Sequence, residues 1–467
     1  MLLDIDASAG SRARAAAESG VLSVLRALGS FERALLIQDR YGPFHVVAVA
    51  PLDGAPAPDI LRAALELLQK RHPLLAARIR QTKGQPCFEA IPNAPLPMSL
   101  LQRQGDEAWR AILESELSRR IDNDRGPLFR CTYLFEAEGA RAEVILALAH
   151  PILDAPGCLL LLDELLRFCQ QLTDGRTPEV SVLEVQPAAD ERFPPAFRGA
   201  AMARQTVQFL MEQVGKEIRY RWATRGQTVL PMRASSPGHI LNMRFSPEFT
   251  DRIARRARLE RVTLNSLLNA AMVLAVNRHL YDGRAMPMRT VTFATLRPYV
   301  IPPLSESTLS PYITMLRYTL MVAPARGLWD LARDLQSQIE SSFRRGHKFV
   351  AAKTTEQLIG MANRLRAFRL ANTAMNYNGP VKLDPVYGGI SVLGLHGAIS
   401  TVGVGPEYAA QVSLFNEELS WDITYTEADM DQALAQRIAD EIRSSLDSAT
   451  SEASSVSRFS SAPAARP

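Results

Sequence analysis

The sequence contains few cysteines, and none of them forms a recognisable pair. Only Cys87, Cys131, Cys158 and Cys169 occur in 467 residues, without a C-x-x-C spacing or a His/Cys cluster of the zinc-binding kind. So few cysteines make no disulfide framework, and a chain of this length can bury a hydrophobic core without one. We therefore expect buried, reduced thiols, no metal site and a cytoplasmic location.

Long apolar runs and a strong excess of one charge are also missing. The most apolar region, Val144 to Leu166, is interrupted by polar residues and is too broken for a membrane span. The N-terminus lacks the continuous apolar stretch of a secretory signal. With 53 basic and 49 acidic residues, the formal net charge of +4 is too small to indicate nucleic-acid binding. We expect a soluble, globular monomer without a transmembrane segment.

Motifs that mark several common enzyme classes are absent as well. There is no G-x-S-x-G elbow for a serine nucleophile, no H-E-x-x-H metal motif and no Walker-type phosphate loop. The nearest glycine pattern, Gly403-Val404-Gly405, lacks the third glycine of a dinucleotide fingerprint. If the chain is an enzyme, these absences favour direct attack of one substrate on another, with no bound cofactor.

Strand-like and helix-like patterns are mixed in both halves of the chain. The run APDILRAALELLQKR has apolar residues at helical spacing, while FRCTYLFE and AEVILALAH are typical of a strand hairpin. A stretch rich in proline and acidic residues, 174–197, indicates a linker, and we expect a long helix over 197–224. The mixture lacks the regular βαβα spacing of a doubly wound sheet, so we predict an α+β fold with two lobes of similar size.

The strongest candidate for chemistry is the segment from His150 to Asp154. His150 ends a buried strand-like run, and Asp154 follows four residues later in the loop before a helix. A histidine in that place can act as a general base, because its ordinary pKa of about 6.5 suits proton abstraction at neutral pH. An H-x-x-x-D string is short, however, and a histidine at a strand end more often has a structural role. The spacing alone does not predict an enzyme.

Further segments occur in a recognisable order around this one. They are LRAALELLQKRHPLLAARI, RRIDNDRGPLFRCTYLF, LALAHPILDAPGCLLLLDELL, LRP at 296–298, MNYNGP at 375–380 and AQVSLFNEELSWDITYTEADMD. The ordered set resembles the superfamily of CoA-dependent acyltransferases and nonribosomal-peptide condensation domains, whose active-site motif is HHxxxDG. The resemblance extends over residues 28 to 448. It implies two chloramphenicol-acetyltransferase-like lobes, each a mixed sheet flanked by helices, with a tunnel between them.

The motif departs from the family pattern at two positions. Ala149 replaces the first histidine, and Ala155 replaces the glycine after the aspartate. The family uses the second histidine as its base, so the resemblance implies that His150 removes a proton from the acceptor. It also implies that Asp154 is structural and pairs with an arginine, for which Arg297 is the candidate, because an unpaired buried carboxylate is costly. The resemblance gives four candidate residues of the substrate channel: Gly157, Asn378, Ser400 and Thr401.

These expectations give a division of the chain and a function. The predicted parts are an N-terminal extension (1–27), an N-terminal lobe with the HxxxD motif (28–183), a linker with a bridging helix (184–238), a C-terminal lobe (239–450) and a disordered tail (451–467).

The implied function is that of a stand-alone acyltransferase of secondary-metabolite or lipid biosynthesis. It would move an acyl group from a phosphopantetheine thioester, on a carrier protein or on CoA, to a small-molecule alcohol. Amide formation on an amine acceptor, an isomerising variant, and a catalytically silent member that binds a carrier protein are the alternatives.

Overall fold

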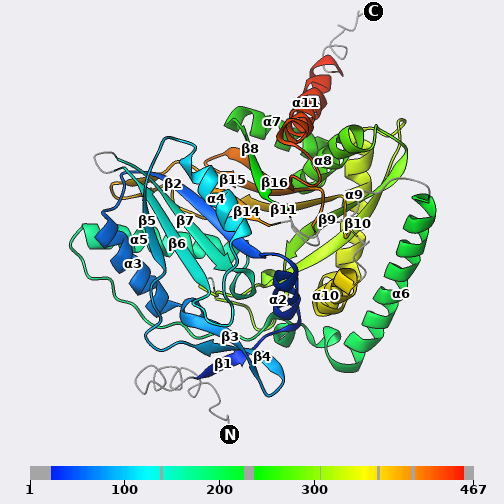
Figure 1. The fold of residues 1–467 in the computed structure, drawn as a ribbon. Coiled ribbons are helices and arrows are strands. Elements are labelled where there is room, and N and C mark those ends of the chain that lie inside the picture. The colour runs from blue at the N-terminus through cyan, green and yellow to red at the C-terminus, as the bar shows by residue number, and fades with distance from the viewer. Residues whose placement is uncertain are drawn as a thin grey trace, which may run out of the picture.

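The computed structural model describes residues 23–136, 140–225, 236–305, 307–364, 369–400 and 405–456. Within these ranges the strands form two large mixed sheets and a small antiparallel one, and helices flank both large sheets (Figure 1). The predicted α+β architecture with two sheet-containing lobes is confirmed. The first 22 residues, and the part of the predicted tail from 457 onwards, lie outside the described residues.

The sheet of the first lobe is built around a buried hairpin. Phe129 of β6 lies opposite Leu148 of β7 in antiparallel register, as the sequence pattern predicts. Every residue of β7 after Arg141 is buried, because helices cover the sheet. The lobe contains β2 (His45–Asp53), β5 (Met98–Gln102), β6 (Phe129–Phe135), β7 (Arg141–Ala149), α2 (Ser30–Tyr41), α3 (Pro58–Arg71), α4 (Ala108–Ser118) and α5 (Ala155–Thr173). The small sheet beside it comprises β1 (Val24–Ala27), β3 (Ala77–Thr82) and β4 (Gln85–Ala90).

The second lobe has a six-stranded sheet among the described residues and one helix buried on all sides. That helix, α8, is buried from Ser266 to Asn277, which explains why its sequence is apolar all round rather than striped. The strands are β8 (Gly238–Phe245), β9 (Met286–Thr295), β10 (Ile313–Val322), β11 (Thr373–Pro380), β15 (Tyr408–Phe415) and β16 (Glu418–Thr426). The helices are α7 (Pro247–Leu259), α8 (Leu264–Leu280), α9 (Leu328–Arg344), α10 (His347–Arg364) and α11 (Gln432–Val456).

The chain crosses back to the first lobe near residue 386, which the sequence did not predict. The strands β12 (Val386–Tyr387), β13 (Ile390–Val392) and β14 (His396–Ile399) extend the first sheet at β2. The range 239–450 therefore does not form one lobe by itself. These strands are two to four residues long, too short to show an alternating pattern.

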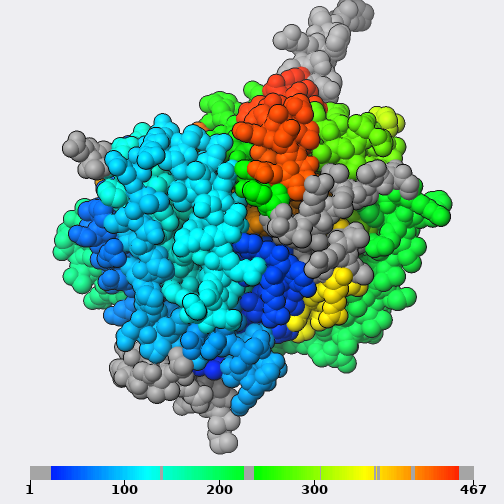
Figure 2. Space-filling view, viewed as in Figure 1, coloured from blue at the N-terminus to red at the C-terminus, as the bar shows by residue number. Residues whose placement is uncertain are grey.

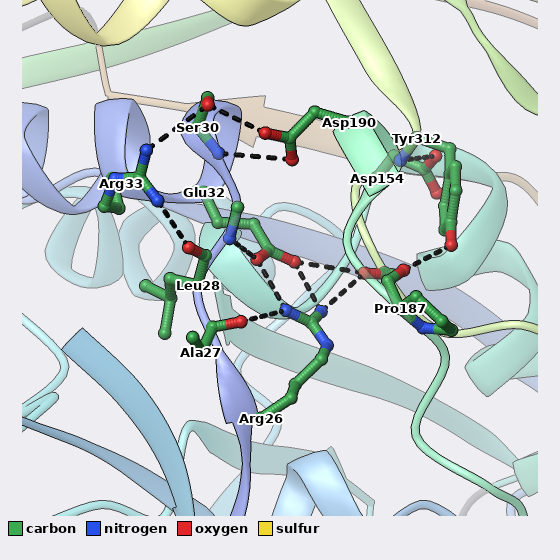
Figure 3. Close-up of polar contacts among 12 residues, drawn as sticks. Arg26, Ala27, Leu28, Ser30, Glu32, Arg33, Asp154, Pro187, Asp190 and Tyr312 are labelled. Carbon is green, nitrogen blue, oxygen red and sulfur yellow. Dashed lines mark hydrogen bonds and ion pairs between the residues drawn. The ribbon is translucent and has the colours of Figure 1, made fainter. Parts of the chain in front are cut away.

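The predicted linker is packed against the rest of the molecule. Residues 176–188 have no helix or strand, and two short 3₁₀ turns follow, η3 (Ala189–Arg192) and η4 (Pro195–Phe197). Asp190 accepts a hydrogen bond from Ser30 Oγ at 2.9 Å (Figure 3). It also accepts one from Lys353 Nζ at 2.7 Å, and so joins α2 to α10. The long helix α6 (Gly199–Ala223) begins after these turns. The exact domain boundaries stay a prediction.

No single helix within the described ranges has the length and apolar character needed to cross a bilayer. The helices α7 and α8 meet that test only as a pair, which is bent by 101°.

Candidate active site

His150 lies where the central hairpin of the first lobe ends. The strand β7 stops at Ala149, and a single 3₁₀ turn, η2 (His150–Ile152), leads into the loop before α5. The His150 side chain is buried, and its Nδ1 is 3.0 Å from the carbonyl oxygen of Leu153. A carbonyl oxygen can only accept, so Nδ1 carries the proton and Nε2 keeps its lone pair.

Burial sets the protonation state of this imidazole. Removal from water lowers the pKa of His150 below its ordinary value, although the hydrogen bond to Leu153 and the charge of Asp154 act in the opposite direction. The ring of Phe44 lies 5.6 Å from the imidazole ring and contributes to the apolar surroundings. At neutral pH His150 is therefore neutral, with one ring nitrogen able to accept a proton.

Asp154 is fully engaged with other protein groups. Arg297 binds it through two hydrogen bonds, Nη2 to Oδ1 at 2.7 Å and Nε to Oδ2 at 3.1 Å. The backbone N–H groups of Gly157 and Tyr312 donate to Oδ1 and Oδ2, at 3.0 and 3.1 Å. The pairing of Asp154 with Arg297 expected from the resemblance is present, and it joins the two lobes. With both oxygens occupied and 1% of the residue exposed, Asp154 has no lone pair directed at a substrate.

The loop conformation does not require the glycine that the family has after the aspartate. Asp154 is the N-cap residue of α5, and its side chain accepts the N–H of Gly157. Ala155 is the first residue of the helix and Pro156 follows, positions where ordinary helical backbone is adopted. Gly157 is correspondingly a helix residue whose amide binds Asp154. It does not line either of the cavities described below, unlike the prediction from sequence.

Two cavities between the lobes adjoin at His150. One contains about 810 Å³ of empty space and the other about 920 Å³, counting the part of each that is open to solvent. Five residues line both of them: His150, Phe293, Ile313, Ile399 and Gln411. The histidine therefore faces the place where molecules in the two cavities would meet.

The larger cavity, which we name the apolar cavity, is lined almost entirely by carbon atoms. The helices α2 and α10 and the strands β9, β10, β11 and β15 contribute its walls. Its apolar lining includes Phe31, Ala34, Leu35, Phe44, Val291, Met315, Ile359, Leu370, Ala371, Ala374, Ala409 and Ala410. Ser400, a predicted channel residue, is on this wall, whereas Thr401 lies outside the described residues.

The smaller cavity, which we name the polar cavity, has a row of hydrogen-bonding side chains on one wall. Asn376, Gln411 and Asp422 are aligned across β11, β15 and β16 by the register of these strands. Asn376 Nδ2 donates to Gln411 Oε1 at 2.9 Å and to Asn378 Oδ1 at 3.0 Å. Asn378, another predicted channel residue, also lines this cavity. Gln411 Nε2 has no hydrogen bond to a described residue, so it can donate to a ligand.

A second histidine–carboxylate pair lies in the polar cavity. His396 Nδ1 is 2.9 Å from Asp422 Oδ1, and its ring stacks on Trp109 at 4.0 Å. Asn242 and the backbone N–H of Gly397 also donate to Asp422, at 2.8 Å each. His396 comes from the crossover strand β14 and Asp422 from β16, so the pair joins the two lobes. Sequence reasoning missed it, although Asp422 was visible as a charged residue between Trp421 and Ile423 in the predicted strand.

A further polar cluster supports the segment that binds Asp154. Tyr312 donates its backbone N–H to Asp154 and its hydroxyl to the carbonyl oxygen of Pro187 (Figure 3). Ser310, two residues earlier, accepts from Arg297 through its carbonyl oxygen and contacts Glu32 through its hydroxyl at 3.1 Å. The small sheet and α2 therefore support the active-site loop. The sequence contained no signal for these contacts, because their partners are far apart in the chain.

The cysteine thiols are enclosed by the fold. All four cysteines are free and buried, as the sequence predicts. Cys158 lines the polar cavity, but burial raises the pKa of its thiol to about 12, so it stays protonated. No group of three or more His, Cys, Asp or Glu side chains in the described part of the chain is arranged to hold a metal ion.

Sequence comparisons match parts of the chain. Residues 236–369 match the family model described as phthiocerol/phthiodiolone dimycocerosyl transferase C-terminus. A stretch of 154 residues, 32% of the chain, is 28% identical to tyrocidine synthase 3 of Brevibacillus parabrevis, and spans 2% of that much longer protein.

Solved structures match nearly the whole fold. Polyketide synthase associated protein 5 from Mycobacterium tuberculosis is 17% identical with a TM-score of 0.68, covering 92% of this chain and 100% of that one. Trichothecene 15-O-acetyltransferase from Fusarium sporotrichioides is 12% identical with a TM-score of 0.71, covering 90% and 94%. The starter condensation domain of rhizomide synthetase, solved with C8-CoA and Leu-SNAC, is 16% identical with a TM-score of 0.63, covering 93% and 96%.

The fold, the position of the HxxxD motif and these matches agree. The chain therefore has the fold shared by these acyltransferase and condensation-domain structures.

Proposed function

We propose that the protein transfers an acyl group from a thioester to a hydroxyl group of a small acceptor molecule, with His150 as the general base. One observation carries this proposal. His150 is buried at the junction of two cavities, with Nδ1 held by Leu153 and Nε2 free to accept a proton. The thioester would be acyl-CoA or an acyl group on a carrier protein, and the product would be an ester of natural-product or lipid biosynthesis.

The proposed reaction needs no covalent intermediate on the protein. The acceptor oxygen attacks the thioester carbonyl carbon while His150 Nε2 takes the hydroxyl proton. The tetrahedral intermediate collapses, the carbon–sulfur bond breaks, and the thiolate leaves with the proton from His150. The negative charge on the former carbonyl oxygen needs a donor within hydrogen-bond distance. Gln411 is our candidate for that donor, because it lines both cavities and its Nε2 is unoccupied by described residues.

The linings of the two cavities favour different parts of the substrates. An aliphatic acyl chain would occupy the apolar cavity, since burial of its methylene groups there is favourable and leaves few polar groups unsatisfied. A hydroxylated acceptor would occupy the polar cavity, where His396, Asn378 and Ser413 can bind oxygen atoms.

The alternatives predict different products at the same site. An amine acceptor would give an amide, and the match to condensation domains keeps this as the second candidate. The printed name of the trichothecene enzyme, an O-acetyltransferase, supports the ester. A silent carrier-binding protein is disfavoured, because neither Ala149 nor Ala155 removes a group that His150 or Asp154 needs for its contacts.

The test is intact-mass spectrometry of acyl transfer. The full chain is mixed with octanoyl-CoA or octanoylated carrier proteins and with panels of alcohols and amines. We expect enzyme-dependent loss of the acyl mass from the donor and formation of an ester. His150→Ala should abolish transfer, whereas His279→Ala, which removes an imidazole from the end of α8, should leave the rate unchanged. Transfer by His150→Ala at the parental rate would refute the mechanism, and amide products alone would assign the alternative.

A further inference from the structure

The helix α6 exposes a continuous apolar row to solvent. Val207, Met211, Val214, Ile218 and Trp222 follow one another at spacings of four, three, four and four residues, and therefore share one helix face. Their exposed fractions are 62%, 69%, 53%, 63% and 77%. The helix forms the outer edge of the second lobe in Figures 1 and 2. The 25 residues of α6 span about 37 Å.

The opposite face of α6 packs on the second lobe through Met202, Phe209 and several polar residues. Glu217 Oε2 is 2.6 Å from Arg289 Nη2, and the Arg289 guanidinium lies 3.4 Å from the ring centre of Tyr220. Glu212 pairs with Arg345 at 2.8 Å. A surface helix of a globular protein normally buries its apolar stripe and exposes its charges. In α6 Met202 and Phe209 are buried in this way, and the exposed row is a second apolar face that the fold leaves uncovered.

Positive charge surrounds this row. Arg204 precedes it by one turn, Arg225 follows it by one turn, and Arg219 and Arg221 lie beside it, all exposed. Of the acidic residues of α6, Glu212 pairs with Arg345 and Lys216, and Glu217 pairs with Arg289 and Arg221. The outward face therefore combines apolar side chains, a terminal tryptophan and the exposed Arg204, Arg219 and Arg225.

We propose that α6 attaches the protein to anionic membrane surfaces, lying in the plane of the interface. Apolar residues, an interfacial tryptophan and flanking arginines are the features by which amphipathic helices bind anionic lipid headgroups. A row one side chain wide suits a bilayer surface, whereas a stable protein interface buries about 800 Å² on each partner. A second copy fits less well, because either orientation of two α6 helices brings arginines of the two copies together. The proposal is independent of the acyl-transfer reaction.

The experiment is co-sedimentation of the full chain with phosphatidylcholine vesicles, with and without phosphatidylglycerol. We expect binding to the vesicles with phosphatidylglycerol that weakens at high salt, and little binding to pure phosphatidylcholine. The variant Met211→Glu/Ile218→Glu should bind at least about tenfold more weakly, as should Arg219→Ser/Arg225→Ser at low salt. Leu259→Glu is the matched control, since Leu259 is 74% exposed on α7, and it should bind like the parent.

Failure is readily recognised, because the substituted side chains are exposed and their loss should not unfold the chain. Equal melting temperatures of the parent and the variants would establish that the variants are folded. Equal binding of the parent and Met211→Glu/Ile218→Glu to anionic vesicles would overturn the proposal, as would no binding by the parent. A dimer in sedimentation velocity that the same substitutions abolish, without vesicle binding, would assign the face to a second copy.

Discussion

Removal of the Arg297 side chain is predicted to destabilise the protein by about 3 kcal/mol, near the lower end of the range for breaking a buried ion pair. Asp154 is 1% exposed and receives two of its four hydrogen bonds from Arg297. Without the guanidinium, a buried carboxylate keeps only the backbone N–H groups of Gly157 and Tyr312. The loss of stability stays near the lower end of the range for buried ion pairs, because these two backbone donors remain.

The reciprocal change tests the same contact. Asp154→Ala removes the buried charge and also the N-cap of α5, which costs about 1 kcal/mol by itself. The double variant should be more stable than the sum of the two single effects predicts, by about 2 kcal/mol, because each single change leaves an unpaired partner.

The assay is urea denaturation followed by tryptophan fluorescence, for which the buried Trp421 is a suitable reporter. Arg344→Ala is the matched control. Its side chain is 72% exposed and lies 3.8 Å from Glu340, so its removal should cost less than about 0.5 kcal/mol. If Arg297→Ala costs no more than this control, or if the two single effects add, the ion pair does not hold the loop as argued here.

Two further predictions concern the reaction. Because burial lowers the pKa of His150, its neutral, basic form persists below the ordinary value of about 6.5. The pH profile of kcat/KM should therefore be flat above neutrality and fall only at lower pH; an inflection above the ordinary histidine pKa would contradict this assignment. Gln411→Leu should reduce kcat by about 10²-fold or more with little change in KM if its amide stabilises the oxyanion. Gln81→Leu, the same substitution at an exposed residue of β3 outside both cavities, is the control, and an equal loss in both variants would refute the role of the Gln411 amide.

Local patterns in the sequence were sufficient for several long secondary elements and for the motif. The alternation and helical spacing of apolar residues report which face of an element is buried, and they predicted the hairpin β6–β7, the helix α3 and the strand end at His150. The ordered family segments then identified Asp154 and Arg297 as partners although they are far apart in the chain. A carboxylate in a buried loop requires such a partner whatever the details of the fold.

The placement of side chains across the interface between the lobes was decided by the tertiary structure alone. The polar row of Asn376, Gln411 and Asp422 depends on the register of three strands, and the short strand β14 brings His396 to it. Gly157, expected in the channel, binds Asp154 instead because it is the third residue of α5. Neither register nor crossover is encoded in a local pattern, since each depends on which distant strands pair.

The helix α6 likewise shows the difference between what the local sequence predicts and what the tertiary structure decides. Its sequence alone predicted a long helix over 197–224, and an apolar face on a helix is normally buried. Only the structure shows that Glu217 and Tyr220 bind Arg289 on the inner side and leave the apolar row outside. Periodicity in a sequence identifies the faces of a helix, but the apolar and charged side chains that the fold places beside it decide which face is covered.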